Sequence, residues 1–241
     1  IYAVAGGPAP PQTELLQRAG SRPPARELTD EEGTRHRLWV EPIDDGLVDW
    51  YRDETLLIAD GHHRYQTALV HQEEMRRERG PGPWDAVMML VVDAATEDPP
   101  VLPIHRVVRA NGIGDLPGER VRGLEEILAR LVDDDLSYGA AIATGDGVIH
   151  IVGKLQGNPP TVSALHRALL DDRDIRDLWF VPDAALAEAR VREGFGDVAL
   201  FLPPARVEHV RAVVASGGRL PQKSTYFWPK PRTGMVLRPL E

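Results

Sequence analysis

The sequence predicts an α+β fold, in which mixed α/β layers combine a mixed sheet with flanking helices. First, helical and strand-like patterns alternate along the 241 residues. Second, Tyr138–Thr144 and Val148–Lys154 flank Gly145-Asp146-Gly147, a spacing that predicts an antiparallel hairpin. Third, the apolar run Ala86–Val92 is too continuous for a half-exposed strand and indicates a buried one. Strands that mix with helices in this way build packed layers.

Each element follows from its periodicity or its boundary signals. Thr55–Ala59 reads as a short buried strand that ends at the turn signal Asp60-Gly61. The clearest helix covers residues 63–79, where apolar side chains recur at helical spacing and Gly80-Pro81 ends the pattern. Further helices are expected at residues 13–18, 45–52, 121–132, 162–170, 184–193 and 207–215, and further strands at 35–40, 84–92, 104–108, 178–181 and 198–202.

A Gly/Pro-rich stretch, Asn111–Gly118, marks the expected domain boundary. Residues 1–110 are predicted to form a phosphate- or nucleotide-binding core, and residues 111–241 a C-terminal α/β portion with a basic tail. A single continuous domain is the alternative. The chain begins at Ile1 and its first methionine is Met75, so we expect it to lack an N-terminal segment.

Composition excludes several classes of site and partner. The chain has no cysteine, which excludes disulfides, thiolate metal sites and a cysteine nucleophile. No apolar run approaches the ~20 residues that cross a bilayer, and no secretion signal begins the chain. We therefore expect a cytoplasmic protein with no membrane partner. The formal net charge of -9 disfavours nucleic acid as a partner, because phosphate neutralisation needs clustered cations.

Positive charge is nevertheless concentrated at the C-terminal end. Residues 205–241 contain seven Lys or Arg and two Asp or Glu, which leaves residues 1–204 at -14. A basic tail on an acidic body suggests either self-complementary docking or a local anion site.

The segment richest in candidate functional side chains is the junction from Asp60 to Arg64, where a buried strand is expected to end and a helix to begin. Asp60 is the expected N-cap of that helix. Gly61 permits a tight turn and a close approach of a ligand to the backbone. His62, His63 and Arg64 add positive charge to a helix N-terminus that is already positive, and a bound anion removes this conflict.

We therefore predict a phosphate-binding turn at this junction. One alternative is that Asp60 only caps the helix while the histidines and the arginine are solvated. A metal site is a weaker alternative, because adjacent histidines on a helix point about 100° apart. No metal ligand is assigned.

Two other segments are candidates for anion binding. Lys223-Ser224-Thr225 and Lys230 place two of the three lysines beside hydroxyls, although the glycines of a Walker A loop are missing. We expect the tail to bring Lys223 near Arg64; a basic strand that packs its aromatic residues in the core is the alternative. His105-Arg106 opens a strand, where adjacent side chains face opposite sides, so only one of the two is expected to face a cleft.

Two further His-Arg pairs are expected to be structural. His36-Arg37 lies on a predicted strand, where a cross-strand role at the surface is favoured. His166-Arg167 lies on an amphipathic helix, whose solvated face is its expected place.

Three motifs resemble those of a protein family found in bacteria and archaea. They are Ile58–Tyr65 with Thr67–Leu69, Leu102–Val108, and Leu220–Lys230 with Thr233-Gly234 close behind. On these motifs the chain resembles the family catalogued as domain of unknown function 1015. Its Asp-Gly-His-His-Arg box resembles, more distantly, the phosphate-contacting box of the ParB/sulfiredoxin superfamily and of its free-serine kinases.

This resemblance implies a ParB/sulfiredoxin-like core in the N-terminal half, with Gly61, His62, His63 and Arg64 on the phosphates of a nucleotide. In the relatives an acidic residue upstream of the box acts as the base, and no such residue is assigned here. The absence of cysteine excludes a sulfiredoxin-like thiol mechanism.

The leading functional prediction is a nucleotide-dependent phosphotransferase acting on the hydroxyl of a small metabolite. ATP, ADP or another nucleotide with Mg²⁺ would be its cofactor, and His63 and Asp60 are the catalytic candidates. The first alternative is a non-catalytic ParB-like nucleotide-binding or regulatory module. The second is a phosphate or nucleotide hydrolase with His63 as general acid or base. Whether the protein is an enzyme, its acceptor substrate and its oligomeric state are left open.

Overall fold

The computed structural model describes residues 1–241 except 6–8, 32, 43–44, 98, 111–112, 114, 133, 172–173 and 240–241. The chain divides into two compact units, which are described separately. The first unit contains Ile1–Pro99 and Lys230–Glu241, and the second contains Pro100–Pro229. The division into domains 1–110 and 111–241 stays a prediction; the compact units divide at Pro99, and the chain returns to the first unit at Lys230.

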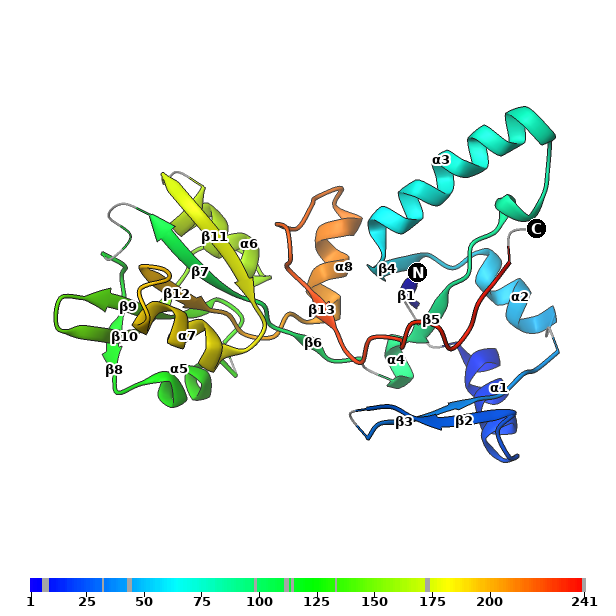
Figure 1. Cartoon of the computed structure of the whole chain (residues 1–241), viewed down its shortest axis with the longest axis horizontal. Helices are drawn as coiled ribbons and strands as arrows, with labels where there is room; N and C mark the ends of the chain where they lie inside the picture. Colours follow the sequence, from blue (N-terminus) through cyan, green and yellow to red (C-terminus); the bar gives the residue numbers. More distant parts are fainter. Residues whose placement is uncertain are drawn as a thin grey trace. The chain divides into compact units, whose positions relative to one another are not determined.

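The first unit is built on a three-stranded sheet in the order β4-β1-β5. β1 runs antiparallel to β4 and parallel to β5. A separate hairpin joins β2 to β3, and α3 leads away from the end of β4 (Figure 1). The elements of this unit are β1 (Tyr2–Ala5), α1 (Pro10–Gly20), β2 (Arg26–Thr29), β3 (Arg35–Leu38), α2 (Asp45–Arg52), β4 (Leu56–Asp60), α3 (His62–Arg79), the 3₁₀ turn η1 (Pro83–Asp85), β5 (Leu90–Asp93) and α4 (Ala94–Glu97).

The second unit is built on a six-stranded sheet in the order β11-β7-β12-β9-β10-β8. All of its pairings are antiparallel. A two-stranded ladder pairs β6 with β13. The elements are β6 (Val101–Leu102), β7 (His105–Ala110), β8 (Glu119–Val121), α5 (Leu124–Leu131), β9 (Ser137–Thr144), β10 (Gly147–Lys154), α6 (Thr161–Leu165), the π-helical turn η2 (His166–Leu170), β11 (Ile175–Val181), α7 (Ala184–Arg192), β12 (Val198–Phe201), α8 (Val207–Ala215) and β13 (Tyr226–Phe227).

Both faces of the six-stranded sheet are buried. On one face Val108 and Ile142 pack with Leu165 and its neighbours from α6 and η2. On the other face Val107 and Ala199 pack with side chains from α5 and α7. Because neighbouring residues on a strand point to opposite faces, the centre of β7 is enclosed on both sides.

The expected α+β class is confirmed, and the hairpin of β9 and β10 forms as predicted. The expectation of a continuous buried strand at residues 84–92 is wrong. A 3₁₀ turn occupies Pro83–Asp85 and β5 begins only at Leu90, while Val87 and Met88 are exposed. Proline at the first position of that turn provides the backbone angle for a turn rather than a strand. In the described part of the chain, no helix is both long and apolar enough to cross a membrane.

Candidate functional site

The predicted turn lies where β4 ends at Asp60 and α3 begins at His62. Gly61 is the N-cap of α3 and adopts a left-handed backbone conformation with φ of +94°. The expectation that Asp60 caps the helix is wrong, because the structure shows no side-chain cap at this end of α3. Asp60 is the last residue of the strand, and its carboxylate binds two cations instead.

Asp60 holds Arg64 and Lys230 on its two carboxylate oxygens. The Arg64 Nη2 atom donates to Oδ2 at 2.7 Å, and the Lys230 Nζ atom donates to Oδ1 at 3.0 Å. The three side chains are 35 %, 65 % and 42 % exposed for Asp60, Arg64 and Lys230 respectively. Solvent and small molecules can therefore reach both cations.

Gly61 and Arg64 are packed against each other. A Cβ atom placed on Gly61 would lie 3.0 Å from Nη2 and 3.2 Å from Nε of Arg64. The positive φ and this close contact both favour glycine at the position. The glycine therefore fixes the start of the helix and leaves room for the guanidinium beside it.

The first turn of α3 leaves its amides open. Its first helical hydrogen bond runs from the amide of Tyr65 to the carbonyl of Gly61. The turn contains no acidic residue, and no group of the described residues accepts from the amides of His62, His63 or Arg64. Both histidines are exposed. Open amides at a helix N-terminus carry a partial positive charge and attract anions.

The tail segment Lys223-Ser224-Thr225 lies in the second unit, whereas Arg64 lies in the first. The predicted approach of Lys223 to Arg64 stays a prediction. Lys223 is exposed with a left-handed φ of +54°. Ser224 is buried and its hydroxyl donates to the carbonyl of Pro221. Lys230, which follows in the same basic tail, is the residue that the structure brings to the Asp60 turn.

His105 and Arg106 are both buried, at 2 % and 0 % exposed. His105 packs edge-on against Phe201 and its Nδ1 atom accepts from the amide of Leu202. Burial, followed by the charge of Arg106, lowers the pKa of His105 to about 4. The side chain is therefore a neutral core histidine. Neither member of the pair is open to solvent in the second unit.

Sequence reasoning missed His166, whose expected place was a solvated helix face. The structure places Arg167 at the surface as expected, but His166 is half-buried and its Nε2 atom accepts from Nε of Arg106 at 3.3 Å. Burial and the Arg106 charge lower the pKa of His166 to about 4. The apolar spacing of the helix could not reveal this contact, because it depends on a strand 60 residues away. The surface role expected for His36-Arg37 is confirmed: Arg37 lies opposite Glu27 on β2 and donates to it at 2.7 Å.

One protein-family model matches part of the chain. A family model described as "Protein of unknown function (DUF1015)" matches residues 7–121. The resemblance expected from the motifs is confirmed over this range, which contains the Asp60 turn and His105-Arg106 but not Lys223 or Lys230.

Two solved structures resemble the chain distantly. One is a conserved hypothetical protein from Pyrococcus furiosus, with 16 % identity and a TM-score of 0.41 over 71 % of this chain and 69 % of the other. The other is described as a free serine kinase in complex with AMP, with 15 % identity and a TM-score of 0.42 over 71 % of this chain and 67 % of the other. Likeness at this level identifies neither a fold nor an activity. No curated protein matches the chain.

Proposed function

We propose that the turn Asp60–Arg64, completed by Lys230, binds the phosphate groups of a nucleotide. The observation that supports this most is the sharing of one carboxylate by two cations, at 2.7 Å and 3.0 Å. The cluster carries one negative and two positive charges, and the open amides of α3 add to the positive side. A phosphate group that approaches this cluster gains two charge-assisted partners and several backbone donors.

The reaction proposed for this site is phosphoryl transfer to the hydroxyl of a small metabolite. Such transfer depends mainly on positioning and on offsetting phosphate charge. Arg64 and Lys230 would supply that charge, and the exposed His63 is the candidate proton carrier. The resemblance of the Asp-Gly-His-His-Arg box to that of free-serine kinases supports this reaction over others.

The residues present are compatible with a nucleotide that carries Mg²⁺. Magnesium in such sites is held through one or two carboxylates together with the phosphates themselves. Asp60 is the carboxylate that the turn offers, and the described residues contain no group of three acidic or histidine side chains able to hold a metal without a ligand. The ion would therefore arrive with the nucleotide, and its chemistry would be to bridge and neutralise phosphate oxygens.

The test is a nucleotide-binding and transfer assay on the full chain. ATP, ADP and CTP are each added with Mg²⁺, and the shift in melting temperature is measured for the wild type and for Arg64→Ala and Lys230→Ala. Both variants should lose at least about tenfold in affinity, because each removes a charge-assisted hydrogen bond. Arg77→Ala is the matched control, since Arg77 is an exposed arginine of the same helix that pairs with Glu73.

A panel of amino acids and other small hydroxyl compounds then distinguishes the proposed reaction from its alternatives. Phosphorylated product that disappears in His63→Ala supports the kinase. Binding without any product supports a regulatory module, and release of phosphate without an acceptor supports a hydrolase. If no nucleotide raises the melting temperature of the wild type, the site has been misassigned.

A further inference from the structure

The second unit contains a buried positive charge with neutral partners. Arg106 on β7 is fully buried, and burial lowers its pKa to about 10, so it remains charged at neutral pH. Its guanidinium donates to His166 and to backbone carbonyls, and it lies 5.2 Å from the ring centroid of Phe180. Among the described residues no carboxylate forms an ion pair with it. A buried charge without a counter-ion is costly, and an anion nearby would lower that cost.

Two of the carbonyls that Arg106 binds are consecutive. Its Nη2 atom donates to the carbonyl of Gln222 at 3.2 Å and to that of Lys223 at 3.1 Å. Both peptide bonds are trans, since the cis bonds of the described chain are at Pro160 and Pro229. In a planar trans peptide the N–H points away from the C=O. The amides of Lys223 and Ser224 therefore both point away from the guanidinium.

These two amides have no acceptor among the described residues. Lys223 is also the only non-glycine residue of the described chain with a positive φ. A left-handed residue in a turn brings successive N–H groups onto one side and forms a concave anion-binding nest. The Arg106 charge polarises the two peptide groups through their carbonyls, which strengthens the amides as donors.

We propose that Arg106 shapes a second anion site, in which the amides of Lys223 and Ser224 and the ammonium of Lys223 bind a phosphate group. Arg106 is a positioning residue here, because it is sealed behind the turn and acts through the two carbonyls. The site lies in the second unit and uses none of the residues of the Asp60 turn. Its existence is therefore independent of the function proposed above.

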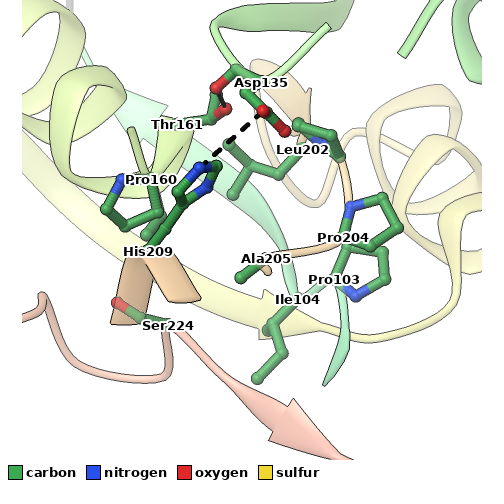
Figure 2. Close-up of a pocket in the computed structure, with 12 residues that line it drawn as sticks. Pro103, Ile104, Asp135, Pro160, Thr161, Leu202, Pro204, Ala205, His209 and Ser224 are labelled. Carbon is green, nitrogen blue, oxygen red and sulfur yellow. Dashed lines mark hydrogen bonds and ion pairs between the residues drawn. The ribbon is translucent and has the colours of Figure 1, made fainter. Parts of the chain in front are cut away.

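A pocket next to Ser224 offers a competing interpretation, which the contacts disfavour. Figure 2 shows Ser224 in the same pocket as His209 and Asp135, an arrangement that resembles the parts of a catalytic triad. The Ser224 hydroxyl, however, donates to Pro221. The Asp135 carboxylate lies 3.3 Å from Nε of Arg206 and 3.9 Å from Nε2 of His209, so its nearer partner is the arginine. The backbone of the turn is the better candidate for a ligand.

The experiment is a titration of the ¹⁵N-labelled full chain with inorganic phosphate at constant ionic strength, read by amide chemical shifts. The amides of Lys223 and Ser224 should shift and saturate together with phosphate, and should not respond to sodium chloride. Lys223→Gly keeps the positive φ without strain but lacks the ammonium, and should weaken binding by about fivefold. Arg219→Gln removes an exposed arginine of the same tail and should leave the response unchanged.

The Arg106 variants separate positioning from folding. Arg106→Gln keeps donors for the carbonyls but removes the charge, and should abolish the saturating shift while the β9 and β12 resonances stay dispersed. Arg106→Lys restores the charge and should recover part of the response. Should Arg106→Gln fail to fold, Lys223→Gly and the chloride control still decide the matter. The proposal is overturned if the two amides follow ionic strength alone, or if Arg106→Gln binds phosphate like the wild type. Shifts confined to His62–Arg64 would likewise overturn it while supporting the nucleotide site.

Discussion

The same dipeptide, His-Arg, has opposite surroundings in the two units. His63-Arg64 begins a helix at the surface of the first unit, where Arg64 is 65 % exposed and pairs with Asp60. His105-Arg106 begins a strand whose two faces are covered, and its arginine is fully buried against neutral acceptors. Burial therefore separates the two arginines. Arg64 is open to solvent, whereas Arg106 is enclosed and holds the backbone carbonyls of Gln222 and Lys223.

The largest expected effect is on stability when the buried arginine is removed. Arg106→Met removes the donor that binds the carbonyls of Ile104, Gln222 and Lys223. An unsatisfied buried acceptor costs about 1–3 kcal/mol, and of these three residues Ile104 is buried. We expect the free energy of unfolding of the second unit to fall by about 3 kcal/mol in urea titrations. Arg64→Met, the exposed counterpart in the first unit, should change the free energy of unfolding of that unit by about 0.5 kcal/mol or less. Equal losses from the two variants would show that burial does not set how much each arginine contributes to stability.

Acid should destabilise the second unit through the buried His105 and the half-buried His166. Burial lowers the pKa of both His105 and His166 to about 4, whereas histidines of the unfolded chain take up protons below about pH 6.5. The unfolded chain then binds more protons, so stability is full above about pH 6.5 and falls as the pH drops towards 4. The slope should be at most roughly 1.4 kcal/mol per pH unit for each histidine.

The check is urea unfolding between pH 4 and pH 7. His105→Gln/His166→Gln removes both titrating groups while leaving an acceptor at each position, and should flatten the slope within this window. A slope that is unchanged in the double variant would show that other groups cause the acid sensitivity.

A smaller effect is expected at the glycine that begins α3. Gly61→Ala places a side chain at a φ of +94° and within 3.0 Å of Arg64, and a left-handed backbone costs about 1–2 kcal/mol for an ordinary residue. Thermal unfolding should show that loss, and phosphate affinity should fall because Arg64 is displaced. Gly20→Ala is the control, since its Cβ would meet nothing within 4 Å. If the two variants lose the same stability and affinity, the backbone angle of Gly61 and its contact with Arg64 do not hold the turn.

Local signals in the sequence predicted much of the fold. The bounds expected for α2 and α8 agree with the structure, and the hairpin of β9 and β10 follows from its turn residues. The pairing of β6 with β13 could not be predicted, because each strand has two residues and more than a hundred residues separate them. Such short strands have no periodicity of their own.

The candidate site shows the same limit. The strand–turn–helix junction at Asp60 was predictable from residues that are adjacent in the sequence. The approach of Lys230 to Asp60 was not, because it depends on the return of the chain to the first unit after Pro229. The excess of positive charge in the tail suggests self-complementary docking or a local anion site, and in the structure Lys230 of this tail pairs with Asp60. The contact of His166 with Arg106 depends on β7, so the residue pattern of its own helical segment could not predict it.

The most direct test of the central claim asks whether the Asp60 carboxylate competes with phosphate for Arg64 and Lys230. If Arg64 and Lys230 form the anion site, the Asp60 carboxylate occupies them until a phosphate arrives. Calorimetric titration with inorganic phosphate, without divalent cations and at constant ionic strength, should then show that Asp60→Asn binds about fivefold more tightly than the wild type, a gain of about 1 kcal/mol. Weaker or unchanged binding in Asp60→Asn would contradict the account, because the two cations would then have no part in holding the anion.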